Sequence, residues 1–155
     1  MKKSVQLITN IRSLYHKMTW LNEFEMKDRF GDYTSSEVHC IEFIGKNEEI
    51  NVTKLAEAFY MTRGAISKMS KKLIKKGAIE FYKKPDNKKE IYFRLTDQGN
   101  EVYKLHEKLH DEFLDRDKAV YDQVSEEQFD AMLCFIENFS DHLDLEIEKR
   151  ELDIK

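Results

Sequence analysis

Glycine and proline are scarce in this chain of 155 residues, which contains five glycines and one proline. The glycines are Gly31, Gly45, Gly64, Gly77 and Gly99. Phosphate-binding loops and dinucleotide-binding turns need glycines within about six positions of one another. No Gly-x-Ser-x-Gly sequence, which marks the nucleophile of many hydrolases, is present either. These absences argue against the common nucleotide-dependent enzymes and against serine hydrolases.

Cysteine and long apolar runs are also rare. The two cysteines, Cys40 and Cys134, form no Cys-x-x-Cys pair. The basic N-terminus is followed by no apolar segment of the secretory type, and no stretch approaches the roughly 18 apolar residues of a membrane helix. Isolated cysteines in such a chain are expected to be reduced and to pack as small buried hydrophobic groups. We therefore expect a cytoplasmic protein without a membrane segment.

Apolar periodicity predicts helices on both sides of a central basic region. With 41% hydrophobic and 36% charged residues, the composition suits a soluble, helix-rich chain. Residues 4–24 repeat apolar side chains every three or four positions, and the polar residues 27–33 are expected to connect this helix to the next. Thr34 and Glu37 have the spacing of a capping box, in which each side chain accepts a hydrogen bond from a free backbone N–H.

The central region has the pattern of a helix-turn-helix. Asn51 is a favourable N-cap for a first short helix, and Thr62 is one for a second. Apolar residues of the second helix recur at i, i+3 and i+7, so that they share one buried face: Ile66, Met69 and Leu73. Gly77 is expected to end this helix. Two short helices joined by a tight connection are typical of the DNA-reading helix-turn-helix.

A basic hairpin is expected to follow. Residues 80–83 and 91–95 are rich in strand-forming side chains with a period of two. Between them, Pro85 begins a Pro-Asp-Asn sequence that favours a turn. A helix-turn-helix followed by a two-stranded hairpin is a winged helix.

Positive charge is concentrated in this same region. Residues 61–94 contain eleven basic and three acidic residues, a net charge of +8, whereas the whole chain has a net charge of −4. A contiguous basic block in an acidic protein is typical of proteins that bind the phosphate backbone. Winged helices can also be protein-interaction modules, but the basic block disfavours that alternative.

The order and spacing of these features resemble the MarR family of bacterial transcription regulators. The matching segments are Leu55-Ala56-Glu57, residues 62–67, Leu73 with Lys76-Gly77, and Leu95-Thr96 with Gly99. The resemblance implies a mainly α fold with a small β-hairpin: a winged helix-turn-helix over residues 34–121 and a dimerisation region from residues 1–33 and 122–155. It also implies a homodimer that binds double-stranded operator DNA, acts as a repressor and responds to a small-molecule, acyl or metal effector.

Two sets of residues are candidates for DNA contacts. On residues 61–72, which the resemblance places in the major groove, the side chains outside the buried face are Thr62, Arg63, Ser67, Lys68 and Lys71. On the wing the candidates are Lys83, Lys84, Lys88 and Lys89. Lys89 stands where the family usually has an arginine, so the wing keeps the charge but lacks the planar guanidinium.

The C-terminal helix carries an apolar seam that needs a partner. Its members step by 3, 4, 3 and 4 residues, as in a coiled coil: Phe129, Met132, Ile136, Phe139 and Leu143. The partner is either the N-terminal helix or a second subunit, and the resemblance implies that both contribute. Residues 97–155 have a net charge of −11, from 18 acidic and 7 basic residues, and are expected to lie away from DNA.

Three histidines allow a metal-dependent alternative. His106 and His110 are spaced i, i+4 and could share a metal ion. Together with His39 they match the ligand positions of zinc-responsive repressors similar to MarR, in which a carboxylate from the first helix, here Glu23 or Glu25, completes the site. The chain also resembles the fatty-acid-synthesis branch of the family, in which similar histidines imply no zinc. No cofactor is required under that interpretation, and the histidines would bridge helices by hydrogen bonds.

The sequence leaves two further hypotheses, an enzyme and an effector pocket. The histidines could form a metal hydrolase site with Glu107 and Asp111, but no nucleophile motif supports it, so we expect no enzymatic activity. Aromatic residues near the N-terminus could line an effector pocket or form core: Tyr15, Trp20, Phe24, Phe30 and Tyr33.

Overall fold

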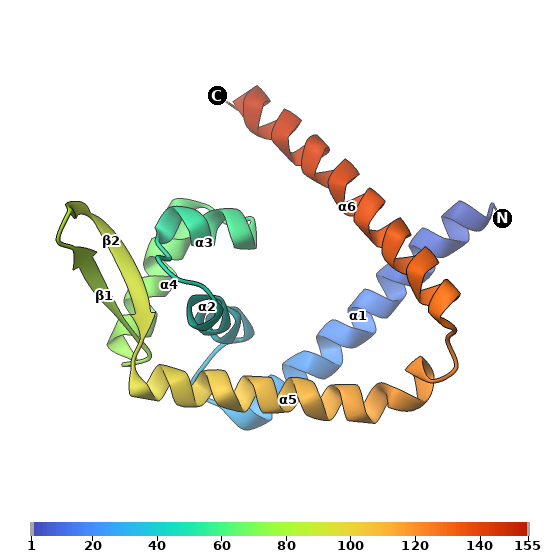
Figure 1. Ribbon diagram of the computed structural model, residues 1–155, viewed down its shortest axis with the longest axis horizontal. Helices are drawn as coiled ribbons and strands as arrows, with labels where there is room; N and C mark the ends of the chain where they lie inside the picture. The colour runs from blue at the N-terminus through green and yellow to red at the C-terminus, as the bar shows by residue number, and fades with distance from the viewer. Residues whose placement is uncertain (1, 155) are drawn as a thin grey trace. The chain divides into compact units, whose positions relative to one another are not determined.

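The computed structural model describes the backbone of residues 2–154 and the side chains of residues 2–151. The outermost residues of the two expected dimerisation segments, 1 and 155, lie outside this range. The elements follow in the order α1 (Lys3–Phe30), α2 (Ser35–Lys46), α3 (Val52–Phe59), α4 (Arg63–Lys75), β1 (Ile79–Lys84), β2 (Asn87–Leu95), α5 (Asp97–Tyr121) and α6 (Glu126–Ile154) (Figure 1). This is the expected mainly α chain with a single hairpin. Among the described helices, none combines the length and apolar character needed to cross a membrane.

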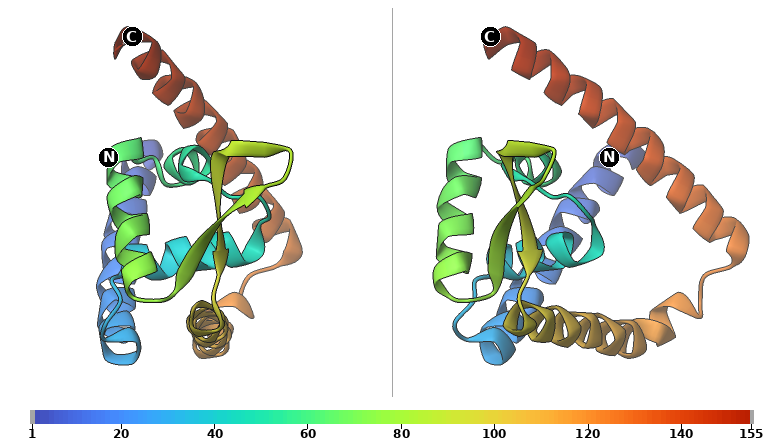
Figure 2. Two further views of the ribbon diagram at one scale, coloured as in Figure 1. Left: turned by 90° about the vertical axis from the view of Figure 1, so that its left-hand side faces the viewer. Right: turned by 60° about the vertical axis from the view of Figure 1, so that its left-hand side comes forward.

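The chain forms two compact units whose boundary lies inside α5. The first unit is Met1–Leu109 and the second is His110–Lys155. The first contains α1 to α4, the hairpin and the first half of α5, with α2, α3 and α4 gathered beside the hairpin (Figure 2). The second contains the rest of α5 and α6. The assignment of residues 34–121 to DNA binding and of the ends to dimerisation stays a prediction.

Helix α1 is longer than the sequence suggested. It continues through Phe30, so the expectation that residues 27–33 form a connection is wrong for residues 27–30. The reason is tertiary: Met26 and Phe30 lie one helical turn apart and are each only 4% exposed. Burial of these two side chains stabilises the last turn of the helix, although its other residues are polar. In the sequence the polar residues suggest a connection, and the burial of Met26 and Phe30 cannot be seen.

The expected helix starts are confirmed. At α2, Glu37 N–H donates to Thr34 Oγ1 at 3.2 Å and Thr34 N–H donates to Glu37 Oε2 at 3.1 Å, which completes the capping box. Lys54 N–H donates to the Asn51 side chain at 2.8 Å, and Ala65 N–H donates to the Thr62 hydroxyl at 3.1 Å. These bonds fix where α2, α3 and α4 begin.

Glycine ends α4 where the sequence placed it. Gly77 has φ 79°, a left-handed conformation that glycine adopts without a Cβ clash. Its N–H donates to Ile74 O at 3.0 Å, and the next N–H, of Ala78, donates to Leu73 O at 3.0 Å, which is the Schellman pattern. The turn is packed closely on α5, since a Cβ built on Gly99 would lie 1.9 Å from Ala78 O.

The hairpin pairs antiparallel strands with an irregularity between Tyr82 and Lys84. The strands are longer than residues 80–83 and 91–95, because the ladder extends to the pair Lys84 and Asn87 around the expected turn. At its base, Phe93 N–H donates to Ile50 O at 2.8 Å and joins β2 to the α2–α3 connection. The wing is therefore anchored to the helix-turn-helix by backbone as well as side chains.

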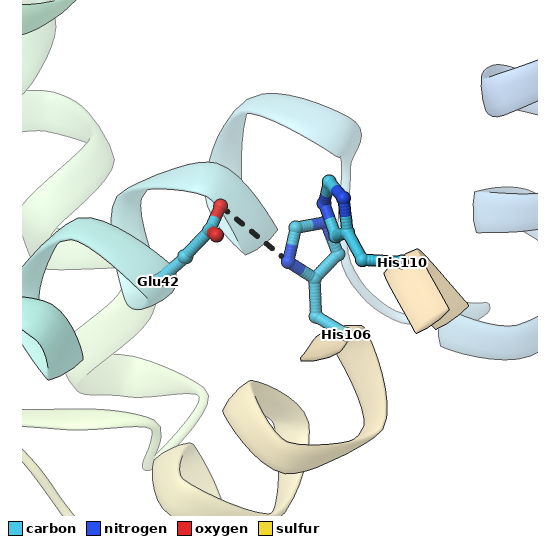
Figure 3. A group of neighbouring side chains, drawn as sticks. All are labelled: Glu42, His106 and His110. Carbon is cyan, nitrogen blue, oxygen red and sulfur yellow. Dashed lines mark ion pairs between the residues drawn. The ribbon is translucent and has the colours of Figure 1, made fainter. Parts of the chain in front are cut away.

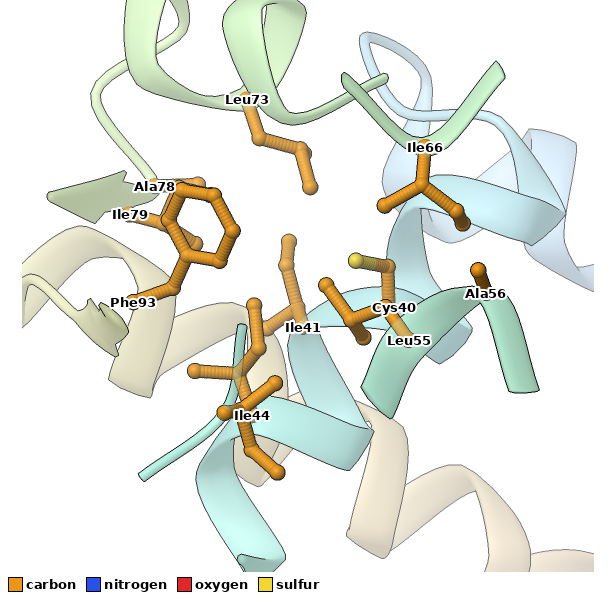
Figure 4. Close-up of a cluster of buried hydrophobic side chains, with 11 residues drawn as sticks. Cys40, Ile41, Ile44, Leu55, Ala56, Ile66, Leu73, Ala78, Ile79 and Phe93 are labelled. Carbon is orange, nitrogen blue, oxygen red and sulfur yellow. The ribbon is translucent and has the colours of Figure 1, made fainter. Parts of the chain in front are cut away.

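One hydrophobic core holds the helix-turn-helix and the base of the hairpin together (Figure 4). Its fully buried side chains come from α2, α3, α4 and β1, and the largest include Ile41, Leu55, Ile66, Leu73 and Ile79. Burying one leucine or isoleucine side chain contributes about 1.5–3 kcal/mol. Since α3 has only eight residues, this packing rather than intrinsic helix propensity keeps it folded.

Candidate nucleic-acid interface

Helix α4 is anchored by one face and exposes the other. Ile66, Ser70 and Leu73 are buried, and the Ser70 hydroxyl donates to Ile66 O at 2.8 Å within the helix. The predicted contact residues lie outside that face: Thr62, Arg63, Lys68 and Lys71 are exposed and Ser67 is partly exposed. A rigid helix with an exposed basic face has the geometry that enters a major groove.

The tip of the wing is ordered by its own turn. Asn87 Oδ1 accepts hydrogen bonds from the N–H groups of Lys89 and Glu90, both at 3.2 Å. Lys88 and Lys89 lie at this tip with exposed side chains, and Lys83 is exposed on β1. The wing therefore presents three cations from a defined backbone.

Lys84 differs from the other wing lysines. Its Nζ donates to Glu49 Oε1 in the α2–α3 connection and lies 5.0 Å from the centre of the Tyr92 ring. The hydrogen bond to Glu49 and the Glu49 charge raise the pKa of Lys84, whereas desolvation opposes the shift. An ammonium group held in this way is less able to approach a phosphate than a free one.

Lys84 belongs to a ladder of rings and cations on one face of the hairpin. Tyr82 and Tyr92 face each other with ring centres 5.6 Å apart, and the Arg94 guanidinium lies 5.1 Å from the Tyr82 ring. Arg94 Nε donates to Glu80 Oε1 at 2.7 Å. Cation–π and cross-strand contacts of this kind stabilise the wing and neutralise part of its charge.

The basic block of the sequence thus divides into two groups. Lys76, Lys84 and Arg94 are paired with Glu37, Glu49 and Glu80, respectively. Across the described residues no ion pair involves the remaining eight, which are Arg63, Lys68, Lys71, Lys72, Lys75, Lys83, Lys88 and Lys89. Charges without an internal partner are the ones available to phosphates, and periodicity alone cannot distinguish the two groups.

The histidine cluster forms around a buried imidazole. His106 on α5 is 2% exposed, and its Nδ1 lies 3.5 Å from Glu42 Oε2 on α2 (Figure 3). The His39 ring centre lies 5.4 Å from that of His106, so the structure brings these two predicted residues together. His110 is exposed one turn after His106 on the same helix.

Glu42 is the carboxylate beside this imidazole, a position for which the family resemblance implies Glu23 or Glu25 on α1. Glu25 instead lies 3.4 Å from Arg29 Nε. The signal for Glu42 was present, because it follows His39 by three positions and shares its helix face. Carboxylate and imidazole atoms are the donors that zinc accepts in proteins, and Glu42, His106 and His110 offer this set.

The proposed effector aromatics separate into two groups. Phe30 and Tyr33 line a hollow of about 330 Å³, together with Arg29, Gly31, Asp32, Gln98, Glu101, Val102 and Leu105. Tyr15, Trp20 and Phe24 are exposed on α1 instead, where the Trp20 and Phe24 rings stack with centres 6.1 Å apart. The hollow combines an apolar wall with charged and amide groups, as small-molecule sites do.

The two cysteines have opposite environments. Cys40 is 1% exposed in the core, and burial, assisted by the nearby Glu37 charge, raises the pKa of its thiol to about 12. Cys40 is therefore the inert buried group that was expected. The same expectation is wrong for Cys134, which is exposed on α6.

Comparison with known proteins gives concordant results. The model of the MarR family matches residues 33–91. The chain is 38% identical over 112 residues to the HTH-type transcriptional regulator PchR of Bacillus subtilis, covering 70% of this chain and 64% of PchR. It is also 38% identical over 95 residues to the uncharacterized HTH-type regulator YhjH of the same organism, covering 61% of this chain and 54% of YhjH. The match thus spans less than two thirds of each relative.

The fold resembles solved structures over most of the chain. Streptococcus pneumoniae FabT, crystallised in complex with DNA, superposes with a TM-score of 0.80 and 22% identity, covering 92% of this chain and 98% of FabT. At that identity the likeness establishes the fold, which confirms the winged helix-turn-helix expected from the sequence.

Proposed function

The chain belongs to the MarR family, and from its exposed basic surface we propose that it is a cytoplasmic, sequence-specific, double-stranded DNA-binding transcription regulator that acts as a repressor. The observation that carries this proposal is the set of unpaired cations on α4 and the wing tip. They are displayed by elements whose opposite faces are locked in one core. FabT, which has the same fold, was crystallised in complex with DNA, and this supports DNA binding by the present chain.

In this proposal α4 reads the major groove. Thr62, Arg63 and Ser67 lie toward its N-terminal end, and recognition helices contact base edges with their N-terminal residues. Lys68 and Lys71 follow on exposed positions and would bind phosphates. The wing would place Lys83, Lys88 and Lys89 over the adjacent backbone or minor groove, whereas Lys84 would support the wing through Glu49.

The apolar surfaces of the two terminal helices support a homodimer. Large hydrophobic side chains of α6 are between 37% and 58% exposed: Met132, Leu133, Phe135, Ile136, Phe139, Leu143 and Leu145. Helix α1 exposes a second set: Val5, Leu7, Ile11, Leu14 and Met18. Monomeric proteins rarely leave such continuous apolar faces in water. A second copy of the chain would cover them and would present two recognition helices to two half-sites about 34 Å apart.

An effector would bind in the hollow beside the α1–α2 connection. Its apolar wall of Phe30, Val102 and Leu105 suits a small apolar or acyl group, and the Gln98 amide offers a polar contact. A ligand there would lie next to the residues that end α4, so its binding could change operator affinity.

The test is selection of duplexes from a random pool by the purified protein, followed by footprinting at several salt concentrations. We expect one enriched, two-fold symmetric sequence whose affinity falls steeply with salt, because lysine and arginine contacts release counterions. Failure to enrich any sequence, or binding to a protein partner that is indifferent to salt, would instead favour an interaction module.

A second candidate is regulation by zinc, and the contact between Glu42 and His106 favours it. Glu42, His106 and His110 would be ligands, with His39 adjacent to the site. Zinc needs neutral imidazoles, so its affinity should fall below about pH 6.5. His106→Ala should then abolish zinc binding with little effect on the melting temperature of the metal-free protein.

If His106 is purely structural, the same substitution gives a different result. It should lower the stability of the metal-free protein by about 1–3 kcal/mol, because buried partners lose a hydrogen bond. Thermal melts of wild type and His106→Ala, each with zinc and with chelator, distinguish the two roles. A wild-type melt that does not respond to zinc would end the zinc proposal.

A further inference from the structure

Lys76 is the last residue before the glycine that ends α4, and it points back to the α1–α2 connection rather than outward. Its Nζ donates to Glu37 Oε2 at 2.7 Å and also donates to Asp32 O. The same ammonium lies 5.2 Å from the centre of the Tyr33 ring. Three contacts with residues about 40 positions earlier in the chain thus hold this lysine.

The carboxylate that receives Lys76 is almost buried. The Glu37 side chain is 5% exposed and the Lys76 side chain is 33% exposed. Glu37 also accepts the Thr34 N–H in the capping box, so one carboxylate fixes both the start of α2 and the end of α4. An ion pair with one desolvated partner adds little net stability but constrains geometry, since displacing the lysine would leave the buried charge uncompensated.

Gln98, at the start of α5, makes a second tie to the same point. Its Nε2 donates to Lys76 O at 2.9 Å and to the Tyr33 hydroxyl at 2.7 Å. A Cβ built on Gly77 would lie 3.3 Å from Gln98 Oε1. The end of α4 is therefore enclosed by side chains from the α1–α2 connection and from α5.

We propose that Glu37, Lys76 and Gln98 are positioning residues that set the orientation of α4 on the operator without touching DNA. This inference rests on the proposed DNA-binding function and deepens it. It gives Lys76, one of the cations of the basic block, a role that does not involve phosphates. It also links the hollow described above to the recognition helix. Asp32, Tyr33 and Gln98 line that hollow, and all three contact Lys76 at the end of α4.

The proposal and the simpler alternative, in which Lys76 binds a phosphate, predict opposite changes in DNA affinity for the substitution Glu37→Gln. If Lys76 were a phosphate contact, Glu37→Gln would release its ammonium, remove a negative charge and strengthen DNA binding. If the pair positions α4, Glu37→Gln should weaken binding to the operator. Glutamine can still accept the Thr34 N–H in a capping box, so the start of α2 is retained.

The experiment compares two duplexes: one selected by the wild-type protein from a random pool, and one of unrelated sequence. Glu37→Gln and Lys76→Met should each bind the selected duplex about tenfold more weakly, a typical coupling between sites. Affinity for the unrelated duplex should stay unchanged, and Lys76→Arg should be close to wild type. Glu80→Gln is the matched control, since it removes the partner of Arg94 on the wing surface. We expect that control to keep or raise affinity for both duplexes.

Hydrogen exchange supplies a measurement that does not depend on DNA. In Glu37→Gln the amides of Gly77 and Ala78 should exchange about tenfold faster, because the turn they close loses its external support. The Phe93 amide, which is bonded to Ile50 at the base of the wing, should not change.

Tighter or unchanged operator binding by Glu37→Gln would overturn the proposal, and so would equal losses on both duplexes. Unchanged exchange at Gly77 and Ala78 would overturn it as well. A wild-type protein that selects no duplex would refute the proposed function, and the exchange measurement would still decide whether Glu37 holds the end of α4.

Discussion

The contrast between Lys84 and Lys88 tests whether tertiary contacts decide which wing charges reach DNA. Both are lysines of one hairpin, four residues apart. Lys88 is exposed at the tip, whereas Lys84 is paired with Glu49 and lies over Tyr92. Lys88→Ala should therefore remove a phosphate contact from each protomer, and Lys84→Ala should not.

The magnitude follows from counterion release. Each phosphate contact contributes about 0.9 to the slope of log affinity against log salt, so two lost contacts per dimer flatten the slope by about 1.8. Between about 50 and about 200 mM salt, the affinity of Lys88→Ala should then fall about twelvefold less than that of wild type. Lys84→Ala should keep the wild-type slope and should change the melting temperature only slightly, because its ion pair is partly exposed and screened by solvent.

Fluorescence anisotropy with a labelled, selected duplex at five or more salt concentrations gives both slopes. Thermal melts of each variant exclude unfolding as the cause of a change. An equal flattening in the two variants would show that Glu49 does not restrain Lys84. A wild-type slope for Lys88→Ala would place the wing tip outside the interface.

Three further predictions concern the dimer, the core and the thiols. Phe139→Glu would put a charge into the proposed α6 interface, at a cost of several kcal/mol. It should yield monomers in sedimentation experiments and lose operator affinity; a variant that stays dimeric would show that the α6 seam is not the dimer interface. Gly99→Ala, whose Cβ would meet the backbone of the α4–β1 turn, should lower stability by about 1–3 kcal/mol in denaturant melts, whereas Gly64→Ala, with no atom within 4 Å, should not. At pH 8 a thiol reagent should label Cys134 and spare Cys40 in the folded protein, because Cys40 has a pKa of about 12 and becomes a thiolate only well above that pH; rapid labelling of both would contradict the burial of Cys40.

Local features of the fold were predictable because their causes are local. Thr34, Asn51 and Thr62 each satisfy a backbone N–H three residues later, so their sequence spacing specifies the helix start. Gly77 ends α4 because a left-handed residue was needed there, and alternation of side chains revealed the wing. These are properties of a few neighbouring residues and need no knowledge of distant contacts.

The candidate site was predictable only to the level of residue type. The sequence showed that residues 61–94 carry a net charge of +8. It could not show that Lys76 and Lys84 are engaged by Glu37 and Glu49, which lie 39 and 35 positions away. Pairing depends on which helices pack together, and that is decided by the shared core.

The same distinction separates the remaining successes and errors. The sequence by itself determined the order of the helices, the hairpin, the exposed basic face of α4 and the spacing of His106 and His110. Only the tertiary structure extended α1 to Phe30 through its burial, placed Glu42 beside His106 and exposed Cys134. Helix caps act through hydrogen bonds between near neighbours, and periodicity can be read from near neighbours, whereas burial and ion pairing depend on which distant segments come into contact.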